Sequence, residues 1–363
     1  MEKTKKKTIK KILCLCLTLL LAVTMFAGCH KANEVALTIG SGKDKVEITS
    51  AYYLCTLVNA YQEGQQKVNE AKAEEKKEET EEAEEIDYLK EKIDGKSFTE
   101  WVENRAMEIL LNYAALKNEL KANKVELGEE ELQQVDSMAS TYWIQYGYQS
   151  IFEKNGVGYE TYKSYMKASN EDYTYFNSIY GHDGEKAVDH KELNQFIKAH
   201  YVPVDQAYHP LTNSDGSAVD DATKQEYLKT LNSYAKKLNA GKTTFAKVYK
   251  AVNGELQEGQ SYSTYVGDDK TEYALDEFDK VKKLKDNKAI VLELDGAIVL
   301  LYKRPITKAV QEELHDGATY NMKHDEFTKE LDEIGKTLKV SKNDFAFNRL
   351  KVKNIDVTVE AAE

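Results

Sequence analysis

Apolar residues recur every three or four positions over long stretches of this chain, a spacing that predicts amphipathic helices. The clearest helix is predicted from Phe98 to Ala122, where the apolar side chains would share one face. Another begins at Ser50, which can cap it, and another at Gly128, where three glutamates follow at the positive end of the helix. Two more helices are predicted over residues 189–201 and 308–336.

Short alternating stretches predict strands near both ends of the chain. Residues 35–39 and 46–48 alternate between apolar and polar positions and are joined through Gly40-Ser41-Gly42, so they are expected to form a hairpin. Residues 338–340 and 350–352 have the character of short strands on either side of a small helix.

Residues 204–305 follow a different pattern, in which short apolar strands and helices succeed one another. A helix with an apolar face stops at Gly241, and a second helix begins at Thr244. The last two strands are separated by Asp295-Gly296, a dipeptide that favours hairpins. Three strands are predicted in this stretch: Ala207–Thr212, Ala289–Leu294 and Ala297–Tyr302. The order of the elements predicts an α/β module.

Three pieces of this stretch match one family pattern: Ala207-Tyr208-His209 in the first strand, Ala235, Leu238, Gly241, Phe245 and Ala246 in a helix–glycine–helix step, and Asp276-Glu277-Phe278 at the start of the third helix. On these residues the stretch resembles a parvulin-type peptidyl-prolyl isomerase domain. The flanking segments resemble the N- and C-terminal chaperone segments of PrsA- and SurA-like foldases.

The patterns and the resemblance together predict an α+β fold: a mostly helical, discontinuous chaperone domain with an inserted parvulin-like α/β module. The predicted segments are a lipoprotein signal peptide (1–28), an N-terminal helical chaperone segment (29–203), the module (204–305) and a C-terminal segment that packs back on the chaperone domain (306–363). Residues 62–87 are predicted to be a charged insert. Its Glu-, Lys- and Ala-rich part has no apolar stripe, so it could be a solvated helix or a disordered insert.

The first residues have the features of a bacterial export signal. Six lysines precede an apolar run, Ile12–Phe26, that is too short for an ordinary spanning helix. Small residues, Ala27 and Gly28, then precede Cys29, whose thiol could accept a diacylglycerol after cleavage. The alternative is an ordinary signal peptide or membrane anchor that happens to contain Cys29. We expect lipidation at Cys29, which would place the protein at the cell membrane, on the extracytoplasmic face of a Gram-positive-type bacterium.

The charge of the chain excludes some classes of partner. The formal net charge is −12, and residues 1–28 hold six lysines and one glutamate, a net charge of +5, so their removal would leave −17. Such an acidic protein lacks the basic footprint of a nucleic-acid-binding protein and is not suited to electrostatic docking on anionic lipid. Cys55 would be the last free thiol of the mature chain, and its apolar neighbours predict a small buried residue.

Aromatic residues crowd the region between about residues 142 and 180. They could form a core, or they could form an adaptable apolar cradle for unfolded polypeptides, because tyrosine combines a large contact area with a polar tip. The residues predicted to bind such clients are Tyr142, Trp143, Tyr146, Tyr148, Phe152, Tyr162 and Tyr165.

The resemblance implies a catalytic site with two histidines, a cysteine or aspartate, and an apolar proline pocket. Only His209 falls on such a position in this chain. Ile298 stands where the second histidine is expected, and Lys282 or Lys283 stands where a pocket aromatic is expected. Residues 260–263 replace the glycine-rich strand. The site is therefore interpreted as eroded, with His209 as its vestigial catalytic residue or as an ordinary strand residue.

Other chemistry finds little support. His182, Asp183, Asp189 and His190 have no standard metal-ligand spacing, and no metal or cofactor is expected. The sequence predicts a lipid-anchored foldase or chaperone that holds exported unfolded polypeptides. The first alternative is an active parvulin-type peptidyl-prolyl cis-trans isomerase, which is the activity expected if the protein is an enzyme. The second is a substrate-binding or structural envelope lipoprotein.

Overall fold

The computed structural model describes residues 32–75, 86–213, 216–257, 259–268 and 275–358. It divides into two compact units, Met1–Ile179 with Asp325–Glu363, and Tyr180–His324. The architecture is α+β and mostly helical, as predicted. The second unit is longer at both ends than the module predicted at 204–305, because it also takes in the linking helix before the module and the first part of the helix after it.

The first unit contains a small antiparallel sheet in the order β2-β1-β9. Its strands are β1 (Val35–Ile39), β2 (Val46–Thr49) and β9 (Val340–Lys342). The predicted hairpin is confirmed, since Ile39 pairs with Val46 across β1 and β2. The other edge of β1 pairs with β9, which lies about 300 residues later in the chain.

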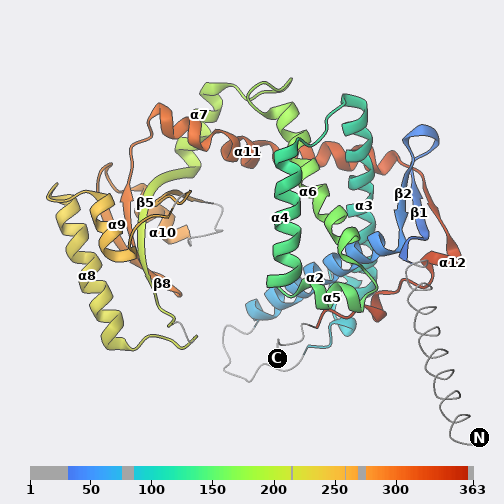
Figure 1. Cartoon of the computed structure of the whole chain (residues 1–363), viewed down its shortest axis with the longest axis horizontal. Coiled ribbons are helices and arrows are strands. Elements are labelled where there is room, and N and C mark those ends of the chain that lie inside the picture. Colours follow the sequence, from blue (N-terminus) through green and yellow to red (C-terminus); the bar gives the residue numbers. More distant parts are fainter. Residues whose placement is uncertain (1–31, 76–85, 214–215, 258, 269–274, 359–363) are drawn as a thin grey trace, which may run out of the picture. The chain divides into compact units, whose positions relative to one another are not determined.

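Helices make up most of the first unit (Figure 1). They are α2 (Ser50–Glu75), α3 (Phe98–Asn123), α4 (Glu129–Gln145), α5 (Tyr148–Lys154), α6 (Tyr159–Tyr180), the part of α11 (Lys308–Thr337) from Asp325 onward, and α12 (Asp344–Phe347). Short elements connect them: η1 (Gly42–Asp44), η2 (Tyr88–Lys90), β3 (Lys92–Ile93) and β4 (Lys96–Ser97). The helix predicted from Phe98 is confirmed, and Ser97 caps it by accepting a hydrogen bond from the Glu100 amide. The charged stretch is helical as far as Glu75.

The core of the first unit lies between α2 and α3. Phe98 and Leu110 of α3 and Leu57 of α2 are fully buried in one cluster. Residues from the C-terminal segment join the same cluster, among them Ala346 and Val352. One prediction for this segment is wrong: residues 350–352 do not form a strand, and the chain passes instead into the short helix η3 (Val352–Asn354).

The second unit is built around a four-stranded antiparallel sheet in the order β6-β5-β8-β7. The strands are β5 (Tyr201–Pro210), β6 (Ser263–Gly267), β7 (Ala289–Glu293) and β8 (Ala297–Lys303). The predicted hairpin around Asp295-Gly296 is confirmed by the pairing of β7 with β8. The first strand begins earlier than predicted, at Tyr201, because it pairs with β6 as well as with β8.

Helices cover both faces of this sheet (Figure 1). On one face, α8 (Asp221–Asn239) and α9 (Phe245–Asn253) pack on Ala207, Ile298 and Leu300. On the other, α10 (Leu275–Lys282) packs on strand residues such as Val204 and Leu301 through Phe278 and Val281.

Two further helices flank the sheet in sequence. The helix α7 (His190–His200) is capped by Asp189, whose carboxylate accepts hydrogen bonds from the amides of Lys191 and Glu192. The long helix α11 (Lys308–Thr337) follows β8, and its first part contributes Val310 and Leu314 to a cluster with α7. The helices predicted at 189–201 and 308–336 are thus confirmed.

Candidate functional site

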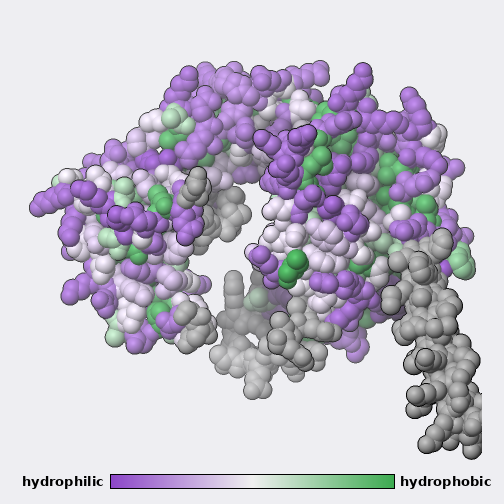
Figure 2. All heavy atoms as spheres, viewed as in Figure 1, coloured by the Kyte–Doolittle hydropathy of each residue, from purple (hydrophilic) through white to green (hydrophobic). Residues whose placement is uncertain are grey.

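The last turns of α4 present large apolar side chains to solvent. The exposed fraction is 36% for Tyr142, 69% for Ile144 and 63% for Tyr146. The rings of Tyr142 and Tyr146 stack with their centroids 5.1 Å apart, because residues four positions apart lie on the same side of a helix. Figure 2 shows a small hydrophobic area over this end of α4 with hydrophilic neighbours. Tyr142 and Tyr146 lie on one side of the helix, whereas Ile144, two positions from each, projects about 160° around the helix from them. We call these three exposed side chains at the end of α4 the α4 patch.

The α4 patch stands on a packed aromatic base. Trp143, Phe152 and Tyr162 are each at most 6% exposed and belong to one buried cluster. The Phe152 and Tyr162 rings lie 4.8 Å apart, and Tyr162 lies 5.2 Å from Trp143. Tyr148 is half-buried and meets both Tyr142, at 5.9 Å, and Tyr162, at 6.1 Å. These rings fasten α4, α5 and α6 together under the patch.

The seven residues predicted to bind clients therefore divide into four groups. Tyr142 and Tyr146 are exposed. Trp143, Phe152 and Tyr162 form core, and Tyr148 links the core to the surface. Tyr165 lies apart from the patch and packs edge-on against Tyr52, and burial raises the pKa of its hydroxyl.

Ile144 was not singled out from the sequence, although a signal was present. The buried stripe of α4 runs through Val135, Ala139 and Trp143, at a spacing of four residues. Ile144 follows the stripe by one residue, about 100° around the helix, so its side chain faces away from the core. An apolar residue that lies off a helix's buried stripe marks a surface apolar position.

His209 lies on β5 in the second unit. Its ring stacks on Tyr227 of α8, with 4.2 Å between the centroids and 16° between the planes. Burial lowers the pKa of His209. Across the sheet His209 pairs with Ile298 of β8, which is fully buried among the side chains under α8 and α9. Ile298, which the sequence predicted at the place of a second histidine, is therefore a core aliphatic residue.

The two lysines at the end of α10 are both exposed and both contact other groups of the second unit. Lys282 is exposed, its ammonium donates to the Ala199 carbonyl, and it lies 5.2 Å from the ring centroid of Phe278. Lys283 is exposed and pairs with Asp279 at 3.9 Å. Both positions keep a charge in water, which is the opposite of what a proline pocket requires.

Residues 260–263 lead into β6, where the structure shows a polar contact that was not predicted. The Ser263 hydroxyl donates to the carboxylate of Asp205 at 2.7 Å, and Arg304 lies 3.4 Å from the same carboxylate oxygen. Burial raises the pKa of Asp205. Alternation along β5 places this carboxylate on the same side of the strand as Ala207 and His209.

Three histidines meet in the second unit. His182 and His190, which were considered as metal ligands, lie with ring centroids 5.5 Å apart. His315 of α11 stacks on His182 at 5.0 Å. In the part of the chain that the structure describes, no group of three or more His, Cys, Asp or Glu side chains is arranged to hold a metal ion.

The N-terminal signal, including Cys29, lies outside the described residues. None of the described helices is both long and apolar enough to cross a bilayer. Cys55, predicted to be a buried hydrophobe, is fully buried, and burial raises the pKa of its thiol.

Comparison with solved structures finds foldases. The chain is similar to the foldase protein PrsA from Streptococcus pneumoniae, with 16% identity, coverage of 71% of this chain and 94% of that chain, and a TM-score of 0.36. PrsA from Bacillus subtilis matches at 13% identity over 74% and 91% of the two chains, with a TM-score of 0.33. PrsA from Lactococcus lactis matches at 14% identity over 72% and 90%, with a TM-score of 0.35.

These structures are PrsA foldases, the family that the sequence resembles. No family model matches the chain, and no curated protein matches it.

Proposed function

We propose that this protein is an extracytoplasmic chaperone, lipid-anchored through Cys29, that holds exported unfolded polypeptides. The observation that carries the proposal is the α4 patch, in which three large exposed side chains, Tyr142, Ile144 and Tyr146, surround the end of a helix that a packed aromatic cluster holds in place. The stacked rings of Tyr142 and Tyr146 form one continuous exposed apolar surface, and such a surface on a folded protein is a mark of an interaction site.

The chemistry of the patch suits an unfolded client. An unfolded chain displays apolar side chains in no fixed order, so its holder needs contacts that tolerate many partners. Tyrosine provides a broad apolar face and a hydroxyl at its tip, and it has few rotamers to lose on binding. Because the rings beneath the patch are packed, little further ordering is needed when a client binds.

The N-terminal sequence supports the same proposal. The charged start, the short apolar run and the small residues before Cys29 are the sequence features of a lipoprotein signal. Acylation at Cys29 would hold the chaperone at the outer face of the membrane, where exported chains emerge unfolded.

Isomerase activity is not supported by the surroundings of His209. Ile298 cannot form the hydrogen bond of a second histidine, and Lys282 and Lys283 keep solvated charges where a proline ring would need an apolar wall. We therefore propose that the protein holds unfolded polypeptides and does not catalyse prolyl isomerisation.

The test measures the aggregation of an unfolded client in the presence of the full mature chain. We expect the wild type to slow aggregation and Ile144→Ser with Tyr146→Ser to lose most of that effect, because these side chains are exposed and their removal spares the core.

The matched control is Tyr208→Ser with Leu256→Ser, which removes one tyrosine and one aliphatic side chain that are also exposed, at 46% and 37%, in the second unit. A client that aggregates equally fast with and without the wild-type protein would refute the proposed function. An equal loss in the control pair would refute the role of the α4 patch.

A further inference from the structure

A lysine-lined cleft lies in the first unit, apart from the residues of the α4 patch. It has a volume of about 720 Å³, within the range of ligand sites. It is bounded by the β1–β2 hairpin, the end of α3, the start of α4 and α6. Its lining includes six lysines: Lys43, Lys45, Lys117, Lys121, Lys124 and Lys167. The lining includes two acidic residues, Glu126 and Glu171, so the cleft is cationic in a chain whose net charge is −12.

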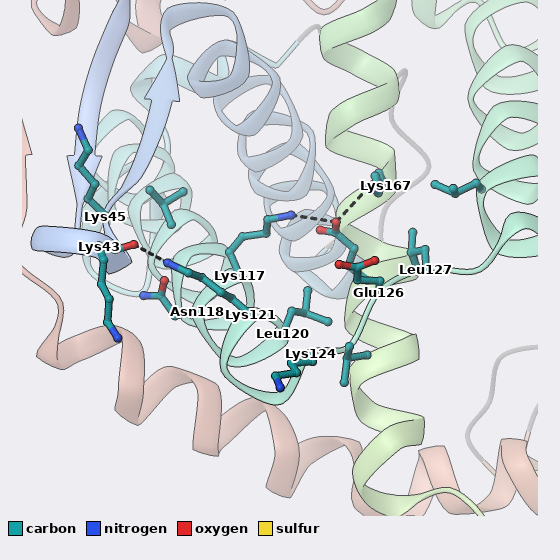
Figure 3. Close-up of a pocket in the computed structure, with 14 residues that line it drawn as sticks. Lys43, Lys45, Lys117, Asn118, Leu120, Lys121, Lys124, Glu126, Leu127 and Lys167 are labelled. Carbon is teal, nitrogen blue, oxygen red and sulfur yellow. Dashed lines mark hydrogen bonds and ion pairs between the residues drawn. The ribbon is translucent and has the colours of Figure 1, made fainter.

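One wall of the cleft is fixed by internal ion pairs. The carboxylate of Glu171 is buried and pairs with Lys117 at 2.9 Å and with Lys167 at 3.5 Å, as the dashed lines of Figure 3 show. Lys121 donates to the Lys43 carbonyl and lies 3.4 Å from a carboxylate oxygen of Asp44. These contacts tie α3 to α6 and to the hairpin, so the cleft has a defined shape.

Two of the lysines have no such partner. Among the residues that the structure describes, no carboxylate forms an ion pair with Lys43 or Lys124, and both side chains are exposed. Two ammonium groups are therefore available to a ligand.

Lys124 has an unusual backbone conformation. It ends α3 with φ of 56° and ψ of 38°, the left-handed conformation in which glycine is favoured and other residues are strained. Its amide donates to the Leu120 carbonyl, which closes the helix. A lysine in this conformation makes the folded protein less stable than a glycine would. The lysine also adds a positive charge to the lining of the cleft.

Part of the lining of the cleft is apolar. Leu120 is buried, Val125 and Leu127 are half-buried, and Leu132 is 40% exposed. A ligand that matches the cleft must therefore bring apolar groups as well as negative charge. A bare polyanion would leave these side chains unmatched.

We propose that this cleft binds acidic segments of client polypeptides in which carboxylates flank apolar side chains; the inference rests on the proposed function. The field of the cleft is local, because charges more than about 8 Å apart are largely screened at physiological ionic strength. A short segment held inside the cleft meets mostly lysines. A long polyanion would extend over the rest of an acidic chain and be repelled.

The test measures the binding of fluorescent peptides by anisotropy, with the full mature chain. The probes are a short peptide that alternates glutamate and leucine, the same peptide with lysine in place of glutamate, and inorganic polyphosphate. We expect only the acidic peptide to bind, more weakly as salt rises. Lys43→Gln with Lys124→Gln should weaken its binding about fivefold, as two partly exposed ion pairs would.

The variant Lys124→Gly distinguishes a loss of peptide binding from a loss of stability. It relieves the left-handed strain, so the melting temperature should stay the same or rise while binding of the acidic peptide falls. The matched charge control is Lys229→Gln with Lys236→Gln on α8, which makes the same change in net charge in the second unit and should leave binding unchanged.

Three results would overturn the inference: equal binding of both peptides, an equal loss in the α8 control, or tight binding of polyphosphate without binding of the acidic peptide. Each can occur while the wild type still slows aggregation, so they are distinct from failure of the proposed function. Conversely, peptide binding in the cleft without any slowing of aggregation would refute the chaperone and leave an acidic-peptide site.

Discussion

At the scale of single residues, neighbouring positions on α4 have opposite roles. Trp143 is buried in the aromatic cluster, whereas Tyr142 and Ile144, on either side of it, are exposed. The helix turns by about 100° per residue, so one step along the chain carries a side chain from the core to the surface. Composition alone cannot separate these roles, and the aromatic crowding seen in the sequence combines a core with a surface.

His209 provides a test at the same scale. Prolyl isomerisation takes tens of seconds without a catalyst, so even modest catalysis is measurable. We expect no acceleration with proline-containing peptides, and no change on His209→Phe, because the partner across the sheet is Ile298 and the ring neighbour is Tyr227. The measurement is a protease-free exchange assay with the full mature chain.

The phenylalanine variant keeps an aromatic ring on Tyr227, whereas His209→Ala also removes the stack and should lower the melting temperature of the second unit. Both variants should still slow the aggregation of a client. Turnover by the wild type that disappears in His209→Phe would show that the isomerase alternative is correct.

At the scale of elements, most helices and hairpins could be predicted because their signals are local. The periodicity after Phe98 and the Asp295-Gly296 turn each lie within one short window, and the structure confirms both. The pairing of β9 with β1 could not be predicted, since the residues of neither strand indicate which strand, about 300 residues away, it pairs with. Residues 350–352 were misassigned because three alternating residues also fit a coil that ends in a short helix.

Close helix packing gives a prediction at this scale. A Cβ added at Gly64 of α2 would lie 2.9 Å from the Phe98 ring, which is fully buried in α3. Alanine normally favours a helix over glycine, but here the contact requires the packed ring to move. We expect Gly64→Ala to lower the free energy of unfolding of the first unit by about 1–3 kcal/mol, measured by urea denaturation.

The control for this variant is Gly317→Ala in α11, where the nearest atom to an added Cβ is the Tyr265 hydroxyl at 4.0 Å. There the helix propensity should dominate, and the free energy of unfolding should rise by up to about 1 kcal/mol. Destabilisation by both variants, or by neither, would contradict the assignment of a close approach at Gly64.

At the scale of the whole molecule, the first unit is assembled from two distant parts of the chain. The sequence alone suggested this discontinuity only through the resemblance to foldases, because the contacts that join the parts are long-range. They include the pairing of β1 with β9 and the packing of Phe347 on Tyr53, with 5.1 Å between the ring centroids. The α4 patch and the lysine-lined cleft both belong to this unit. Both proposed binding sites therefore depend on the C-terminal part of the chain packing on the N-terminal part.

The consequence is that removing the end of the chain should weaken a unit that begins some 300 residues earlier. A chain ending at Thr337 loses β9 together with Ala346 and Val352 from the core, so the free energy of unfolding of the first unit should fall by about 3 kcal/mol or more. The chain has two tryptophans, Trp101 and Trp143, and both lie in that unit, so tryptophan fluorescence during urea unfolding reports on it alone. A chain ending at Thr358 is the control and should match the wild type, since it keeps β9 and these core residues. An unchanged fluorescence transition in the shorter chain would mean that the first unit is complete without its C-terminal part.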